Sequence, residues 1–546
     1  MNENSEKIDE FTLSREILNL IDSYKEAGGG KKNGSIESTI KVSQVLGPLA
    51  FFYERVRNAL EYKGEHLIKR NAIERMLRRQ IWERRSHDPK ILADTLIKEL
   101  IWARYVKNDS VPKRKLTLIS KIIAKYLKIF AALSRTADNY NYTDLKDWLL
   151  GIFSCEIEEV LDSSYFYKEA LNYAVFSWFK KNYEWLDGGL SQKEKETQIF
   201  IAVHRSLSKS DKAGIRYRLL KVYYPSWIEM KDEEFPVNLE KLINSYREIE
   251  KEITSPYQSK MYRFVQRQSA AFLVLREVIG DNPELAMDVI NKPQKLEAKI
   301  KEVCSNKYSQ IRRRVNRGIL RSIIYIFLTK VLLAILIEAP YEIFFKDRFN
   351  VVPILINVMF PPFLMFLVGL SIRKPDEDNT QRIITIINSF VYSGSDSIKQ
   401  EFSLVSNTGG GLIYRIFFVI YSLLFLLTFG GISLILFDLG FNIMSAGIFF
   451  VFISLVLLFA YRIRYTAGEL SVRGEKESFM SHMITNLALP LLNLGSWLSQ
   501  GLQKFNFLLL FMDFLIEAPL KNIIRVFEEW TSFIKEKREE VVEVPN

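Results

Sequence analysis

Cysteine and histidine are scarce in this sequence. Its 546 residues include two cysteines and four histidines, and none of the histidines has a second one at the spacing of a metal site. Cys155 and Cys304 lie far apart in sequence and cannot by themselves form a disulfide framework or a cysteine-based metal site. We expect both to be reduced thiols, buried as small apolar side chains. The sequence predicts no metal and no cofactor.

Motifs of the common catalytic sites are also missing. There is no HExxH zinc motif, no G-x-S-x-G nucleophile elbow and no G-x-G-x-x-G after a strand. The glycine cluster at 28–35 does not fit a phosphate-binding loop, because Lys31 is followed by Lys32 and no strand precedes it. The sequence therefore favours a protein without enzymatic activity.

Charged residues are absent from three long apolar runs, at 351–372, 416–437 and 443–461. An uncharged apolar run of about 18 or more residues spans the ~30 Å hydrocarbon core of a bilayer as a helix. A fourth run, at 319–345, is interrupted by Lys330 near its middle and by Glu338 near its end. A lysine in mid-span costs about 2.5–3.5 kcal/mol on insertion scales, and the surrounding Ile, Leu and Phe residues offset that cost.

Alternating β patterns of useful length are missing too, so the fold class is predicted to be all-α. We expect a polytopic helical membrane protein with a large N-terminal cytosolic helical region and a C-terminal amphipathic helix. The predicted segments are a flexible N-terminal segment at 1–35, helical subdomains at 36–135 and 136–317, a four-span block at 318–465 and an amphipathic tail at 466–546. The predicted spans are 319–345, 351–372, 413–437 and 443–461.

Basic residues beside the apolar runs predict the orientation of the spans. The formal net charge is +11, and five arginines lie between 312 and 321, where the first span begins. Arg415 opens the third span, and Arg462 and Arg464 follow the fourth. Residues 1–32 are polar and contain no signal peptide. We therefore expect a multi-pass protein of the plasma membrane with both termini in the cytosol.

The helix expected at 65–85 is strongly basic. Ile73, Met76, Leu77 and Ile81 give it an apolar side. A solvated face, an anionic lipid surface and an acidic partner each fit this pattern. Nucleic acid is disfavoured, since Trp82 is the one aromatic residue placed for base stacking. The candidate residues for binding an anionic surface are Lys69, Arg70, Arg75, Arg78, Arg79, Arg84 and Arg85.

Ionisable groups at membrane depth are the other candidates for function, because such residues are rare in spans and usually serve a purpose there. They are Lys330, Glu338 and Asp438. Lys330 is expected to face the interior of the bundle and pair with a polar group such as Asn357, or to extend toward the interface. Asp438 ends a span and can reach the head groups.

The leading hypothesis from the sequence is a membrane-anchored interaction or scaffold protein. Its expected partners are the lipid bilayer, anionic head groups, and a further copy of the chain or a protein bound at the cytosolic region. An oligomeric channel or transporter for ions or small solutes is the alternative, because four spans with few charges hardly enclose a polar path alone. A membrane-bound enzyme with an unrecognised site is the third hypothesis.

Overall fold

A computed structural model provides the coordinates of the chain. The structure describes residues 13–29, 38–42, 47–61, 67–82, 88–135, 142–187, 189–227, 235–280, 283–345, 351–372, 375–392, 400–404, 412–472, 479–504, 523, 526, 530, 531, 533, 534, 537 and 538. Among these residues the secondary structure is almost entirely helical, which confirms the all-α prediction.

The helices and strands follow one another in this order: α1 (Arg15–Gly29), α2 (Gly47–Glu61), α3 (Ile68–Trp82), α4 (Pro89–Trp102), α5 (Lys113–Arg135), α6 (Tyr142–Leu161), α7 (Tyr165–Asn182), β1 (Tyr183–Trp185), α8 (Gln192–Leu207), α9 (Lys212–Tyr223), a 3₁₀ turn (Pro225–Trp227), α10 (Phe235–Ile253), α11 (Gln258–Ile279), α12 (Pro283–Ile290), α13 (Pro293–Leu333), a π-helical turn (Ala334–Glu338), α14 (Ala339–Phe345), α15 (Val351–Ser371), α16 (Glu377–Val391), β2 (Gln400–Phe402), α17 (Leu412–Asp438), α18 (Ile443–Ala467) and α19 (Phe479–Lys504).

The chain divides into two compact units. Unit 1 comprises Met1–Ile21, Ser177–Gly189 and Phe264–Lys504, and unit 2 comprises Asp22–Phe176, Leu190–Arg263 and Phe505–Asn546. Unit 1 therefore contains all of the long apolar helices. Helix α13 belongs to this unit and passes without a break across the boundary expected between residues 317 and 318.

Unit 2 is built around an apolar core, to which α3, α4, α5, α6, α9 and α10 contribute buried side chains. Local chemistry sets where several of its helices begin. Pro89 is the first residue of α4, and the Asp88 side chain accepts a hydrogen bond from the Lys90 backbone N–H at 2.9 Å. Ser191 and Glu194 form the capping box that their spacing predicts at the start of α8.

An aromatic cluster holds together the part of unit 1 outside the apolar helices. Trp178 packs edge-on against Phe272 and Phe390, with ring centroids 5.4 and 6.3 Å apart. Phe264 stacks on Phe402 at 4.2 Å. Phe402 is the last residue of β2, which pairs in parallel with β1. Strands of three residues are too short to show an alternating pattern, which is why the sequence did not predict them.

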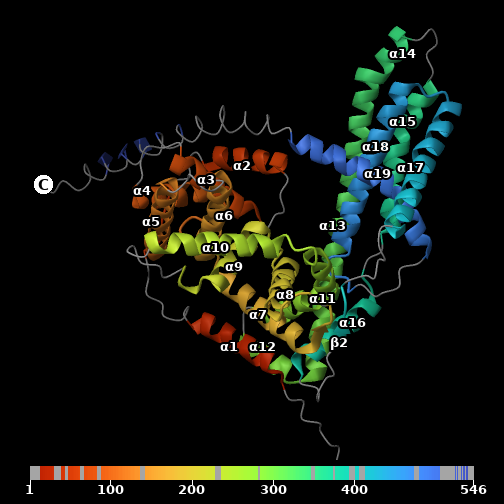
Figure 1. Cartoon of the computed structure of the whole chain (residues 1–546). Helices are drawn as coiled ribbons and strands as arrows, with labels where there is room; N and C mark the ends of the chain where they lie inside the picture. Colours follow the sequence, from red (N-terminus) through yellow and green to blue (C-terminus); the bar gives the residue numbers. More distant parts are fainter. Residues whose placement is uncertain are drawn as a thin grey trace, which may run out of the picture. The chain divides into compact units, whose positions relative to one another are not determined.

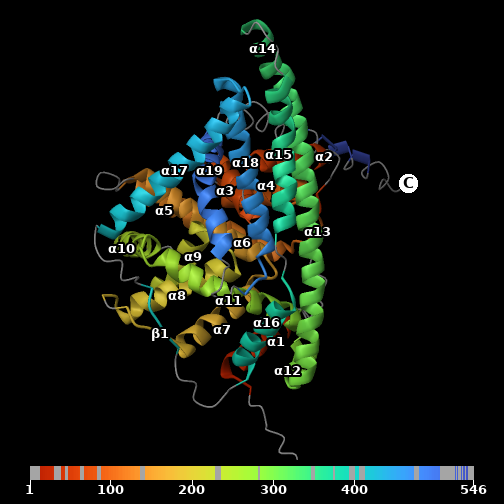
Figure 2. The same cartoon turned by 90° about the vertical axis from the view of Figure 1, so that its right-hand side faces the viewer.

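Four helical stretches of unit 1 are long and apolar enough to cross a membrane: Pro293–Phe344, Val351–Ser371, Phe418–Asp438 and Ile443–Ala467. They coincide with the four predicted spans. Figure 1 shows α13, α15 and α18 running side by side, with α14 at the tip. Helix α17 packs on α19 and tilts away from those three in Figure 2. In Figure 2, α13 continues past α15, α17 and α18 toward α12, and this N-terminal half of α13 is polar.

Prolines inside α15 and a glycine at the crossing of α18 and α19 are the notable backbone features of this block. Pro361 and Pro362 are buried inside α15, and the helix continues through both. Helix α19 packs along α17 and α18. At its crossing with α18, a Cβ added to Gly495 would lie 2.4 Å from the backbone oxygen of Ser454. Glycine is therefore needed there, as it often is where apolar helices approach closely.

The amphipathic tail expected at 466–546 lies mostly outside the described residues from residue 505 onward. Its described members Ile523, Val526, Trp530 and Phe533 are helical and exposed. Their spacing of three and four residues places them on one side of a helix, and the amphipathic tail stays a prediction.

Candidate functional site

Three helices of unit 1 meet around the side chain of Lys330, which is completely buried. Its Nζ donates a hydrogen bond to Asn357 Oδ1 on α15 at 3.1 Å, which is one of the two alternatives that the sequence left open. The same atom lies 3.5 Å from Glu338 Oε1 and 4.3 Å from the centre of the Phe452 ring on α18. A lysine in the apolar part of the bundle thus faces a carboxylate, an amide and an aromatic ring.

Asn357 connects the three helices. Its Nδ2 donates to Glu338 Oε2 at 3.0 Å and to the backbone oxygen of Ser445 on α18 at 3.1 Å. Its Oδ1 accepts from Lys330, so this is the one orientation of the amide that matches every donor with an acceptor. We refer to Lys330, Glu338 and Asn357 as the buried triad. Lys330 and Glu338 lie on one continuous helical run, and Asn357 on α15 connects that run to α18.

The π-helical turn Ala334–Glu338 explains how Lys330 and Glu338 come to face one another. In a regular α-helix each residue turns the chain by about 100°, so residues eight apart would point about 80° away from each other. A π turn is wider, as the bond from Ala339 N–H to Ala334 O shows, and it rotates each residue by less. The two side chains therefore lie on the same side of the helical run.

A second polar contact lies one helical turn beyond the triad. Glu342 on α14 is fully buried, and its Oε1 accepts a hydrogen bond from Asn442 Nδ2 at 2.6 Å. Asn442 also caps α18, because its Oδ1 accepts from the Ser445 backbone N–H at 2.7 Å. This contact ties the end of α14 to the start of α18. The sequence alone did not identify this pair, since it joins residues 100 positions apart.

The triad is a buried ion pair in which Glu338 Oε2 accepts a hydrogen bond from Asn357, while Glu338 Oε1 faces Lys330 Nζ at 3.5 Å and accepts no hydrogen bond from the described residues. Moving two charges out of water costs several kcal/mol for each ion, and the attraction between them roughly offsets this. Breaking such a pair costs about 3–5 kcal/mol, because one charge is left buried alone. The triad therefore favours one packing of α13, α15 and α18 over others. Among the described residues, no group of three or more His, Cys, Asp or Glu side chains converges as a metal site would require.

Asp438, the third ionisable candidate, is separate from the triad. It is the last residue of α17 and is exposed to solvent. Sequence reasoning gave it a simple role at the head groups, and its position at the end of a helix agrees with that interpretation. The structure thus brings together two of the three candidates and adds Asn357 as the residue that connects them.

The basic helix α3 lies in unit 2, and three of its arginines point inward. Arg70 pairs with Asp211 at 2.5 Å, and Arg75 pairs with Glu54 at 2.6 Å. Arg79 pairs with Glu99. Because the three carboxylates belong to α2, α4 and the cap of α9, no local sequence signal could identify them.

Less of the basic helix is exposed than its composition indicates. Arg78 is half exposed and pairs with Asp147 at 3.0 Å. Lys69 is partly buried, and this burial lowers the pKa of its ammonium group. Arg84 and Arg85 lie outside the described residues. Binding of anionic lipid by this helix stays a prediction, and its paired arginines serve the packing of unit 2.

Unit 2 also contains buried polar groups that sequence reasoning missed. Glu156 accepts hydrogen bonds from Lys125 Nζ at 2.5 Å and from the Tyr126 hydroxyl at 2.8 Å. His204 Nδ1 lies 3.0 Å from Asn172 Nδ2, so this nitrogen is the acceptor of an amide N–H. Burial, with smaller contributions from nearby cations, holds the pKa of His204 well below its usual value, and the imidazole is neutral.

Burial raises the pKa of the Cys155 thiol to about 12. A thiol so far from ionisation is a poor nucleophile and a poor metal ligand at neutral pH. Both cysteines are buried, as the sequence predicted.

No protein-family model, curated protein or solved structure matches this chain.

Proposed function

We propose that this chain is an integral membrane protein that crosses the plasma membrane four times and serves as a membrane-anchored scaffold for partner proteins. The observation that carries the proposal is the buried triad. Its charged and amide groups turn inward and pair with one another, while the outward faces of the same helices are apolar. Leu328 and Leu332 on α13, for example, are 60% and 56% exposed. This is the arrangement that lipid as solvent requires.

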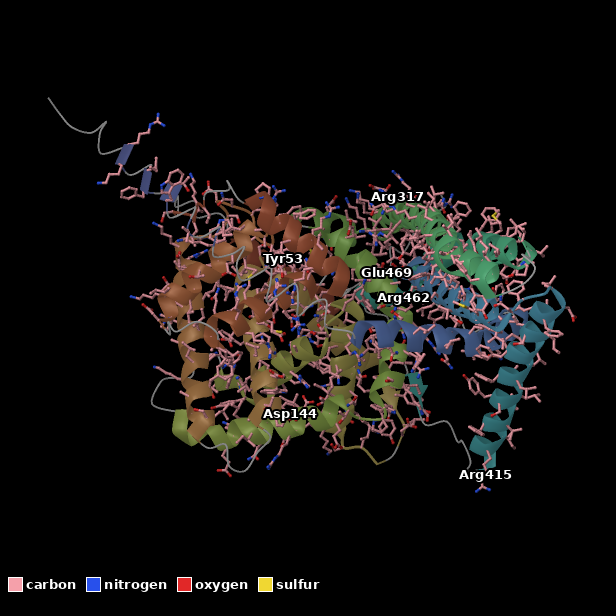
Figure 3. The ribbon with its side chains drawn as sticks, turned by 90° about the horizontal axis from the view of Figure 1, so that it is seen from above. Tyr53, Asp144, Arg317, Arg415, Arg462 and Glu469 are labelled. Carbon is pink, nitrogen blue, oxygen red and sulfur yellow. The ribbon has the colours of Figure 1, made fainter. Side chains whose placement is uncertain are left out.

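The orientation follows from the basic residues. Arg317 on α13, Arg415 at the start of α17 and Arg464 near the end of α18 all mark ends of spans that face the cytosol under the positive-inside rule. Figure 3 shows Arg415 at the end of α17. Both termini would then be cytosolic. Unit 2, held by internal ion pairs such as Arg75–Glu54, would present a firm helical surface to partners on that side.

A scaffold fits the triad better than a transport path does. A path for ions needs polar groups that exchange partners with the solute. In the triad, Asn357 holds both charged groups: its amide oxygen accepts from Lys330 and its amide nitrogen donates to Glu338 Oε2. A channel or transporter remains the second candidate, because an ionisable pair beside a π turn is a feature that functional membrane sites often have.

Two experiments test this proposal. Cysteine reporters placed at Ser35, Ser395 and Thr531 should react only from the cytosolic side, and a reporter at Asn350 only from outside. External labelling at Ser395 would contradict four spans. For transport, the purified protein in vesicles should conduct no ions. A selective ion flux that changes in Lys330→Met, in a variant that still assembles, would overturn the scaffold role in favour of a channel.

A further inference from the structure

Three arginines of α13 form an exposed stripe. Arg313, Arg317 and Arg321 follow one another at four-residue spacing, and all three are exposed. Residues this far apart lie one above the other on an α-helix. The Nε of Arg317 donates to the backbone oxygen of Arg313 at 3.2 Å, which directs the guanidinium along the helix. We call these three residues the arginine stripe.

The charge of the arginine stripe is not balanced within the described residues. From 303 to 337 the sequence contains no aspartate or glutamate. The neighbouring Arg314 lies 4.0 Å from Glu469, whereas no described carboxylate pairs with a member of the stripe. By contrast, the lysines of the same helix nearer its start, such as Lys299 and Lys301, each pair with a glutamate. An unbalanced row of guanidinium groups is complementary to an anion.

An apolar surface continues the stripe along the same face of α13. Ile324, Leu328 and Leu332 follow Arg321 at steps of three and four residues, and each is at least half exposed. The 11 residues from Arg321 to Leu332 extend about 16 Å along the helix. That length is close to one leaflet of a ~30 Å hydrocarbon core.

We propose that the arginine stripe binds the phosphate head group of an anionic phospholipid, whose acyl chain lies against Ile324, Leu328 and Leu332. Guanidinium groups recognise phosphate oxygens through paired N–H donors, which lysine cannot reproduce with the same geometry. The inference rests on the proposed membrane insertion. It assigns lipid recognition to α13, whereas composition had pointed to α3, whose arginines pair with carboxylates.

Helix α18 runs past the stripe. A Cβ added to Gly318 would lie 3.8 Å from Cδ1 of Ile463, so the stripe is level with the end of α18. Arg317 and Arg462 are marked in Figure 3. Arg462 donates toward Ser499 of α19 at 3.4 Å, so it is held by the bundle. Lipid recognition is therefore assigned to the three residues of α13.

The test uses the full-length protein in nanodiscs that contain equal amounts of phosphatidylglycerol and phosphatidylcholine. Native mass spectrometry measures the ratio of the two lipids retained by the protein. Each arginine near the surface is worth about fivefold in affinity for anionic lipid. We expect the ratio to fall about fivefold in Arg317→Gln and further in a triple variant with glutamine at 313, 317 and 321. The triple lysine variant should retain more phosphatidylglycerol than the glutamine variant and less than the wild type.

A triple variant with glutamine at Lys295, Lys299 and Lys301 is the matched control, because it removes the same charge from exposed positions of the same helix. An unchanged ratio in the stripe variants, or an equal fall in the control, would overturn the inference. Alkaline carbonate extraction separates this from the proposed function. A protein released from membranes by carbonate contradicts insertion itself, whereas a retained protein without lipid preference contradicts the arginine stripe alone.

Discussion

Replacing Lys330 with methionine should destabilise the four-helix block of unit 1. Methionine fills a similar volume but removes the only charge that faces Glu338 within the triad. It also leaves Asn357 Oδ1 without its donor. Asn357 and Glu338 are both buried, so neither group can turn to water once the lysine is gone, and the expected effect is destabilising.

The magnitude follows from the burial of both charges. Lys330 and Glu338 are 0% and 1% exposed, so neither charge can be rehydrated without opening the bundle. Breaking a buried pair costs about 3–5 kcal/mol. The double variant Lys330→Met/Glu338→Gln removes both charges and keeps an amide beside Asn357. It should lie within about 1–2 kcal/mol of the wild type, because neutral replacements of buried pairs are often tolerated.

The assay is equilibrium unfolding in mixed detergent micelles, followed by pulse proteolysis, on the wild type, both single variants and the double variant. The resulting cycle should show a coupling free energy of at least about 2 kcal/mol between positions 330 and 338. Additive effects in the double variant, or a loss below about 1 kcal/mol in Lys330→Met, would refute the conclusion that the triad holds the helices together.

Two further outcomes are expected. Gly495→Ala should destabilise the packing of α19 on α18 by about 1–3 kcal/mol in the same assay, because its Cβ would lie 2.4 Å from Ser454 O, whereas Gly501→Ala meets no atom within 4 Å and should be tolerated. His204 has a pKa lowered by burial, so the unfolded chain binds the extra proton first and stability falls as the pH drops below about 6.5. Hydrogen exchange of the α8 amides should report this loss of stability, which amounts to up to about 1.4 kcal/mol per pH unit. His204→Gln should remove the dependence of stability on pH in this range. A dependence that is unchanged in this variant would contradict a neutral His204.

Local patterns were sufficient for the helices and for the four apolar stretches. Length and the absence of charge decide whether a helix can span a bilayer, and both are properties of consecutive residues. The start of α8 was predictable for the same reason, because the capping box of Ser191 and Glu194 lies within four residues. The inward position of Lys330 followed from the cost of placing a charge in lipid, which leaves the bundle interior as the alternative.

The partners of the charged residues were decided by tertiary structure alone. Arg75 reads as a surface cation in the sequence, yet it pairs with Glu54 from another helix. Glu338 lies near the end of an apolar run in the sequence, which does not show its partner, and a π turn rotates it toward Lys330. Hydrophobic periodicity reports which side of a helix is apolar and carries no information on which distant group meets a charge. The sequence by itself determined the apolar helices, while the folded packing of those helices decided which charges are buried in pairs and which remain exposed.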